Sequence, residues 1–145
     1  MIVECLDTDA MVMLGARIAA QVRAGDVISL EGTLGAGKTT LARAIIASLG
    51  HEGEVPSPTF TIIETYEDTR IPVVHADFYR LENPDEAQEI GLDDYRDGAA
   101  LIAEWPDKAG GFRHETNCLA IWLEIVGQGR RAIVEGGKGW VGRMP

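Results

Sequence analysis

The sequence has 145 residues, of which 46% are apolar and 25% are charged. These values are typical of one folded domain and exclude a disordered chain. The 23 Asp and Glu residues exceed the 13 Lys and Arg residues, so the net charge is −10. A chain this acidic is a poor candidate for gripping a nucleic-acid backbone, because that binding depends on clustered Lys and Arg. We therefore expect a single domain over residues 1–145 that reaches any nucleic acid through a basic partner.

The first half of the chain predicts two strand–helix pairs. Residues 2–6 are typical of a short strand, and residues 7–9 offer N-caps to a helix that stops at Gly25. The apolar positions of this helix recur at helical spacing, at Met11, Leu14, Ile18 and Val22. A second apolar run at 27–31 predicts a strand, and a glycine-rich loop joins it to a predicted helix over 40–49.

The middle of the chain predicts three more strands, over residues 60–66, 71–76 and 99–103. The Pro-rich segment 55–59 precedes the first of them and is expected to be extended. Pro84 suits the first turn of a short helix that ends near Gly91.

The end of the chain predicts an antiparallel hairpin. Apolar residues alternate over 119–125, a turn follows at 127–129, and residues 131–135 return as a second strand. The glycine-rich residues 136–145 are expected to form a loose segment.

One segment carries a specific chemical signal. Residues 32–39 match the pattern G-x-x-x-x-G-K-[ST] with the sequence Gly32-Thr33-Leu34-Gly35-Ala36-Gly37-Lys38-Thr39. In such a P-loop the glycines let backbone N–H groups cradle phosphates, the lysine reaches the β- and γ-phosphates, and the hydroxyl binds Mg²⁺. The helix that follows directs its positive end at the same anion. A glycine-rich turn with a surface lysine is the alternative interpretation.

A P-loop site also needs carboxylates for the metal and its waters. Asp77 and Glu104 each close an apolar strand pattern, and the carboxyl ends of parallel strands meet at one edge of a sheet. Each one alone could be an ordinary surface carboxylate. Which of the two would bind Mg²⁺ directly stays open.

The loop around Ser57, Thr59 and Thr61 lies where P-loop switches place a sensor of the γ-phosphate, although a plain Pro-rich connection would look the same. His75 is expected to be a buried, hydrogen-bonded histidine rather than a proton shuttle. Trp105 is expected either in the core or as a cover for the nucleotide or a partner. Arg80 is the best internal candidate for an arginine finger.

Two absences favour ATP hydrolysis over other nucleotide chemistry. No N-K-x-D segment supports guanine selectivity, and no Arg-rich insertion resembles the lid of a nucleotide kinase. A small-molecule or nucleotide kinase remains the alternative function, and a module that senses ATP without hydrolysing it is a third.

Cys5 and Cys118 are the only cysteines and lack the spacing of a zinc site or a disulfide framework. The first residues do not resemble a secretory signal, and no apolar run is long enough to cross a bilayer. We therefore expect a cytoplasmic protein with no membrane partner.

The charge is unevenly distributed along the chain. Seven carboxylates and one arginine lie between Glu82 and Asp97. This stretch is either a solvated surface or a docking face for a basic protein. Charge reversal at Glu86, Glu89 and Asp93 would distinguish the two.

Several motifs resemble one family in order and spacing from about residue 11 to 131. They are the P-loop through Thr40, Ser57-Pro-Thr-Phe-Thr61, His75-Ala-Asp-Phe-Tyr-Arg80, Asn83-Pro-Asp-Glu86, Ile90-Gly91, Asp94-Tyr95, Glu104-Trp-Pro106 and Gly129-Arg130. The combination resembles the TsaE (YjeE) family, the small P-loop ATPases of bacterial tRNA threonylcarbamoyladenosine synthesis.

The resemblance implies an α/β fold of the P-loop NTPase type. Its three layers would hold a mainly parallel central sheet flanked by antiparallel strands. It also implies hydrolysis of ATP with Mg²⁺ beside the partner proteins TsaB and TsaD, which transfer a threonylcarbamoyl group to N6 of adenosine 37 in tRNAs that read ANN codons. The hydrolysis is expected to be weak without these partners and to drive or reset their complex.

The resemblance also assigns roles by position. Catalytic roles fall on Lys38, Asp77 and Glu104, and metal binding on Thr39, Glu104 and Asp77. Nucleotide binding falls on Gly35, Ala36, Gly37, Lys38, Thr39, Thr40, Thr59 and Arg130. The chain departs from the family at Met11, Thr33 and Val55-Pro56, where Thr, Asp and a Lys-bearing segment are usual.

Overall fold

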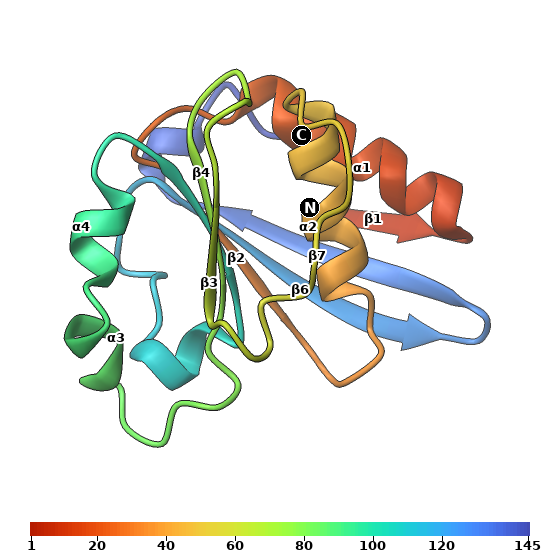
Figure 1. Ribbon diagram of the computed structural model, residues 1–145. Helices are drawn as coiled ribbons and strands as arrows, with labels where there is room; N and C mark the ends of the chain where they lie inside the picture. Colours follow the sequence, from red (N-terminus) through yellow and green to blue (C-terminus); the bar gives the residue numbers. More distant parts are fainter.

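The computed structural model describes residues 1–145 as an α/β fold around one seven-stranded sheet (Figure 1). The strands are β1 (Ile2–Cys5), β2 (Val27–Gly32), β3 (Ile63–Tyr66), β4 (Val73–Asp77), β5 (Ala100–Glu104), β6 (Cys118–Val126) and β7 (Gly129–Gly136). The α-helices are α1 (Thr8–Gln21), α2 (Lys38–Ser48), α3 (Glu86–Glu89) and α4 (Leu92–Arg96), and short 3₁₀ helices cover Pro106–Ala109 and Lys138–Trp140.

The sheet is parallel in its centre and antiparallel at its edges. Its strand order is β1-β7-β6-β2-β5-β4-β3. Strand β2 pairs in parallel with β5 and β6, and β5 pairs in parallel with β4. The outer pairs β1–β7, β7–β6 and β4–β3 are antiparallel. The fold prediction of a mainly parallel sheet flanked by antiparallel strands is therefore confirmed.

Helices cover both faces of the sheet and complete three layers (Figure 1). Helices α1 and α2 lie over one face with the larger core cluster, which includes Ile28 and Leu30 of β2. The short helices α3 and α4 lie over the other face with a smaller cluster, which includes Val27. Every residue of β2 is buried, as expected for a central parallel strand covered on both sides.

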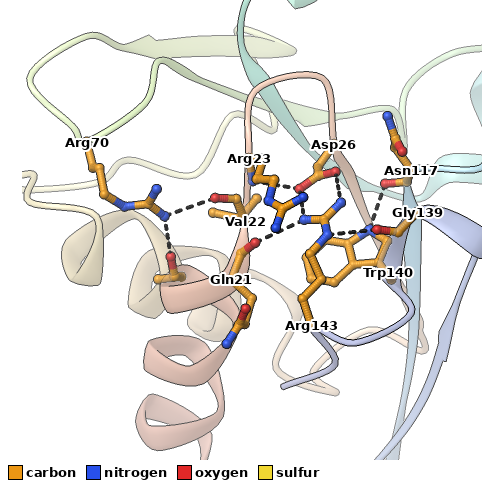
Figure 2. Close-up of polar contacts among 10 residues, drawn as sticks. Gln21, Val22, Arg23, Asp26, Arg70, Asn117, Gly139, Trp140 and Arg143 are labelled. Carbon is orange, nitrogen blue, oxygen red and sulfur yellow. Dashed lines mark hydrogen bonds and ion pairs between the residues drawn. The ribbon is translucent and has the colours of Figure 1, made fainter.

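Helix α1 is fixed at both ends by side chains. The Asp7 carboxylate accepts the N–H of Ala10 at 2.9 Å, the N-cap that the sequence predicts. At the other end, the Arg70 guanidinium donates to the carbonyl oxygens of Ala19 and Val22 (Figure 2). With 14 residues α1 is the longest helix, and no helix is long and apolar enough to cross a membrane.

Gly15 lets α1 approach α2 closely. A Cβ atom at this position would lie 2.6 Å from the Cβ of Ala44 and 3.1 Å from its carbonyl carbon. We expect Gly15→Ala to lower the free energy of unfolding by about 1–3 kcal/mol, because the two helices would have to separate. Urea denaturation measures this change.

The double variant Gly15→Ala/Ala44→Gly is the control for that prediction. It removes the 2.6 Å contact with the Ala44 Cβ and should recover part of the loss, although glycine inside α2 itself costs about 1 kcal/mol. An unchanged denaturation midpoint in Gly15→Ala would contradict the proposed close packing.

The structure differs from the predicted elements at one strand and adds one helix. The strand expected from residue 60 begins at Ile63, because residues 58–62 form a turn in which the Ile62 N–H donates to the Pro58 carbonyl at 2.7 Å. Ile62 has a φ of 69°, an uncommon and strained conformation for a β-branched residue. Helix α4 is absent from the prediction, since it has only five residues and buries only Leu92.

The prediction of a loose segment over 136–145 is wrong. Trp140 is fully buried and donates its indole N–H to the Asn117 carbonyl at 2.8 Å. Arg143 forms two bonds of 2.6 Å to the buried carboxylate of Asp26, just before β2 (Figure 2). The buried Trp140 ring and the Arg143–Asp26 ion pair therefore hold in place a segment whose glycine content suggested mobility.

Both cysteines are free and buried. Burial raises the pKa of the Cys118 thiol to about 12, and the charge of nearby Glu115 adds to this effect. The thiolate is the reactive form of cysteine, so both the raised pKa and the burial of Cys118 disfavour its reaction in the folded protein.

Candidate functional site

The P-loop connects the end of β2, the central strand of the sheet, to the start of α2. Gly37 is the N-cap of α2 and has a φ of 105°, a left-handed conformation that favours glycine. Gly32 ends β2 with a φ of 143°, and a Cβ atom there would lie 2.6 Å from the carbonyl oxygen of Leu123. The first and last glycines of the motif are thus required by the backbone path itself.

Lys38 is the first residue of α2 and is buried. Its Nζ donates to the carbonyl oxygens of Gly32 at 2.6 Å and Thr33 at 3.0 Å, and lies 4.4 Å from the centre of the Trp105 ring. Burial lowers the pKa of Lys38, while the charges of Glu104 and Asp77 act against this shift. The ammonium is therefore held inside the loop, where an anion would compete for it.

The two predicted carboxylates are neighbours in the sheet. Asp77 of β4 is the register partner of Glu104 of β5. The Thr39 hydroxyl of α2 donates to Glu104 Oε1 at 2.8 Å, and the other carboxylate oxygen, Oε2, lies 2.6 Å from His75 Nε2. The prediction that His75 is buried and hydrogen-bonded is confirmed.

Asp77 is connected to the Pro-rich loop. Its Oδ1 accepts the N–H of Tyr79 at 3.0 Å and its Oδ2 accepts the Thr59 hydroxyl at 3.3 Å. Ser57 Oγ lies 2.7 Å from Thr59 Oγ1 and extends this chain of contacts. Burial raises the pKa of Asp77, the Tyr79 N–H opposes the shift, and the charge of Glu104 adds to it. The loop that the sequence singled out as a sensor therefore contacts a predicted site carboxylate.

Lys38, the two carboxylates and the Thr39 and Thr59 hydroxyls line one hollow of about 270 Å³. Its lining residues are Leu34, Gly35, Gly37, Lys38, Thr39, Thr40, Thr59, Asp77, Glu104 and Trp105. All of the predicted site residues are among them except Ala36 and Arg130. Trp105 and Leu34 add apolar walls, and the ring of Tyr79 lies 5.0 Å from that of Trp105.

Ala36 and Arg130 contribute to the loop rather than to that hollow. Ala36 is fully buried, and its N–H donates to the Thr33 carbonyl at 3.1 Å. Arg130 of β7 donates to the carbonyl oxygens of Ala36 at 3.1 Å and Gly35 at 3.0 Å. Arg130 thus braces the outer side of the P-loop from a strand 94 or more residues further along the chain.

A second hollow, of about 410 Å³, adjoins the other side of the P-loop. Its lining residues are Cys5, Leu6, Asp7, Thr8, Met11, Gly35, Gly37, Thr40, Gln128, Gly129 and Arg130. The sequence did not predict this hollow, which forms between the start of α1 and the β6–β7 turn. The sequence motifs had singled out Met11 and Gly129-Arg130, which line this hollow, and these residues were the signals that could have predicted it.

Three other candidates, Ser57, Thr61 and Arg80, lie outside both hollows. Thr61 is exposed and lines neither. The Arg80 guanidinium stacks 4.3 Å from the ring centre of Phe60, which is 80% exposed. Arg80 therefore lines neither hollow in this arrangement.

The oxygen donors of the first hollow suit a hard cation. A hydroxyl and two carboxylates, from Thr39, Glu104 and Asp77, converge at the edge of the sheet beside the P-loop. Mg²⁺ is typically held by one or two carboxylates together with substrate phosphates and waters rather than by a full protein cage. The residues present therefore fit Mg²⁺ bound with a polyphosphate.

Comparison with protein families gives one match over residues 5–133, to the family described as threonylcarbamoyl adenosine biosynthesis protein TsaE. This match includes β2, the P-loop and both site carboxylates. The chain belongs to the TsaE family. The resemblance found in the sequence motifs is thereby confirmed.

Curated TsaE proteins from several bacteria are similar to this chain. The protein from Bacillus subtilis (strain 168) is 48% identical over 88 residues, which cover 60% of this chain and 54% of that protein. The TsaE protein from Haemophilus influenzae is 42% identical over 95 residues, covering 64% and 60%. The one from Nostoc sp. is 40% identical over 107 residues, covering 70% and 65%. The matched segments thus span less than two thirds of the length of each of these relatives.

A solved structure supports the TsaE fold over nearly the whole chain. The crystal structure of Bacillus subtilis YdiB superposes with a TM-score of 0.78 at 28% identity, covering 97% of this chain and 88% of YdiB. The similarity therefore extends to the edge strands and the packed end of the chain.

Proposed function

We propose that this TsaE protein is an ATPase subunit required to form the threonylcarbamoyl group on N6 of adenosine 37 in ANN-reading tRNAs. It would bind and hydrolyse ATP with Mg²⁺ and so drive or reset a complex of TsaB and TsaD. One observation carries the proposal: Lys38, Thr39, Asp77 and Glu104 line the same hollow at the mouth of a P-loop.

Each group of the hollow has a defined role in this proposal. The loop amides and the N-terminal end of α2 would hold the phosphates, and Lys38 would leave the Gly32 and Thr33 carbonyls for the β- and γ-phosphates. Thr39 and Glu104 would hold Mg²⁺, with Asp77 close by. The metal would supply charge neutralisation at the phosphate oxygens.

Hydrolysis requires a water aligned with the γ-phosphate. The carboxylate of Asp77 is fixed by the Tyr79 N–H and the Thr59 hydroxyl, so it would orient such a water in one position. Thr59 would sense the γ-phosphate through this contact. No arginine lies in the hollow, which supports the expectation of weak hydrolysis without a partner, since partners often complete such sites.

Phosphate release with and without TsaB and TsaD tests the proposal. We expect slow release by the protein alone, faster release in the complex, and multiple turnovers of tRNA modification only when this protein is present. Glu104→Ala should abolish the release. Modification that continues unchanged without the protein would overturn the proposal.

The same assay separates the alternative functions. A small-molecule or nucleotide kinase would give a phosphorylated metabolite in place of free phosphate. A module that only senses ATP would bind the nucleotide and release no phosphate, in the wild type as in Glu104→Ala.

The acidic segment Glu82–Asp97 is the proposed docking face for a basic partner. None of its seven carboxylates forms an ion pair, and its single cation, Arg96, pairs with Glu115 outside the segment at 2.6 Å. The segment starts five residues after Asp77 and continues to Asp97. Asp93, Asp94 and Asp97 line a surface hollow together with Gly25, near the opposite end of β2. It would hold the protein on its partners, and tRNA would be reached only through them.

We expect Glu89→Lys/Asp93→Lys to weaken assembly with TsaB and TsaD by about tenfold or more, because repulsion would replace attraction. Both residues are exposed. Glu86 is left out because its Oε1 accepts the N–H groups of Glu82 and Asn83, both at 3.0 Å, so reversal there would disturb the local turn. Titration calorimetry of the complex measures the effect.

The control is Glu52→Lys/Glu54→Lys, which changes the net charge equally at exposed positions elsewhere. ATP binding should be equal in both double variants. Equal weakening of assembly by both would mean that net charge alone matters, and unchanged assembly would return the segment to ordinary surface.

The proposal also includes a cytoplasmic location, which the two free, buried cysteines support.

A further inference from the structure

His75 is the one buried titratable side chain that touches the site without lining it. It lies in β4, is fully buried, and is absent from the lining of both hollows. Its Nε2 is 2.6 Å from Glu104 Oε2, and both residues lie on buried central strands. His75 therefore acts on the site only through Glu104.

Glu104 needs two partners because almost none of it reaches water. The residue is 2% exposed. Its Oε1 accepts the Thr39 hydroxyl at 2.8 Å, so His75 is the recorded partner of Oε2. A buried carboxylate oxygen without a partner is costly and would turn toward another donor. His75 thus fixes the rotation of the carboxylate that presents Oε1 to Thr39.

The surroundings of the ring indicate which nitrogen carries the proton. A carboxylate only accepts hydrogen bonds, so the contact at Nε2 requires an N–H there. Nδ1 is buried and has no partner. The contact with Glu104 therefore places a proton on Nε2.

We propose that His75 is a positioning residue for Glu104 and sets how strongly the site holds Mg²⁺. This inference rests on the proposed function, because it assumes that Glu104 serves the metal. Groups that hydrogen-bond a metal-binding side chain typically change metal affinity or activity by 10–100-fold when removed. His75 would contribute by preorganisation, without contacting nucleotide or metal.

Two substitutions at this position test the inference. His75→Leu removes the donor and keeps an apolar side chain, whereas the amide of His75→Gln can reach the place of Nε2. Calorimetry would measure the affinity for a non-hydrolysable ATP analogue with and without Mg²⁺, and phosphate release would give kcat and KM over a range of Mg²⁺ concentrations.

We expect His75→Leu to raise the half-saturating Mg²⁺ concentration by about 10–100-fold, with analogue affinity in the absence of Mg²⁺ unchanged. kcat should fall at low Mg²⁺ and recover in part at high Mg²⁺. His75→Gln should restore most of the Mg²⁺ affinity. Val73→Ala, a change at a buried position on the same strand, controls for loss of stability and should leave the Mg²⁺ dependence unchanged.

Three outcomes would overturn the inference. They are an unchanged Mg²⁺ dependence in His75→Leu, equal losses in His75→Leu and His75→Gln, and a matching loss in Val73→Ala. If His75→Leu fails to fold, a wild-type Mg²⁺ dependence in His75→Gln supports the inference and a 10-fold loss there contradicts it. If the wild type releases phosphate equally with and without Mg²⁺, the proposed Mg²⁺-dependent function fails and the inference falls with it.

Discussion

Replacing Lys38 by alanine is expected to reduce ATP hydrolysis by at least about 100-fold. The ammonium is the only cation lining the hollow of the P-loop, and removing one preorganised donor to a developing negative charge typically lowers kcat by 10²–10³. Phosphate release in the presence of TsaB and TsaD, where the proposed function predicts the highest activity, measures the effect.

Lys38→Met separates the charge of Lys38 from its packing. The Lys38 Nζ also bonds the carbonyl oxygens of Gly32 and Thr33, so the alanine variant loses both packing and hydrogen bonds. The methionine side chain keeps the length of the stem, and the loss of activity should be equally large. Lys138→Ala, at an exposed position in the 3₁₀ helix after β7, should retain full activity. Activity within threefold of wild type in Lys38→Met would refute the role of the charge.

Arg143→Met is expected to lower the free energy of unfolding by about 3–5 kcal/mol, because it leaves the carboxylate of Asp26 buried and unpaired. Asp26 is 1% exposed and Arg143 6% exposed. Arg143 also donates to the carbonyl oxygens of Gln21 and Gly139 (Figure 2) and lies 4.1 Å from the centre of the Trp140 ring. Chemical denaturation monitored by fluorescence measures the change.

A surface ion pair in the same protein gives the matched control. Arg131 bonds Glu4 at 2.8 Å, but the two side chains are 38% and 51% exposed. Arg131→Met should therefore change the free energy of unfolding by only about 0–1 kcal/mol. Asp26→Asn/Arg143→Met removes the buried charge and should recover a large part of the loss, since the amide oxygen introduced at position 26 can still accept the Arg23 N–H. Equal effects of Arg143→Met and Arg131→Met would contradict a stabilising role for the buried Arg143–Asp26 ion pair.

The geometry of the P-loop was predictable because it is local. Gly32, Gly37 and Lys38 lie within seven residues, and their roles follow from the conformation of one turn and the first residue of α2. Asp77 and Glu104 were predictable for a different reason. Each ends an apolar strand, and parallel strands bring such ends to one edge of the sheet.

Short or non-local elements escaped prediction. Helix α4 has too few residues for a periodic pattern. The turn before β3 holds Ile62 in a conformation that its residue type disfavours, so only surrounding contacts can impose it. The second hollow depends on where the β6–β7 turn lies relative to the start of α1, and that position is set by the strand order.

The sequence by itself determined the family, the P-loop and the residues that line its hollow, because these depend on patterns within short segments. Only the tertiary structure decided how they are held. Arg130 bonds the P-loop although it lies 94 residues further along the chain. His75 contacts Glu104 from the neighbouring strand. Arg143 bonds Asp26, which is 117 residues earlier in the sequence. Composition suggested that the last ten residues are mobile. They are held in place because Arg143 neutralises the buried carboxylate of Asp26, which would be costly to leave charged and unpaired in the core.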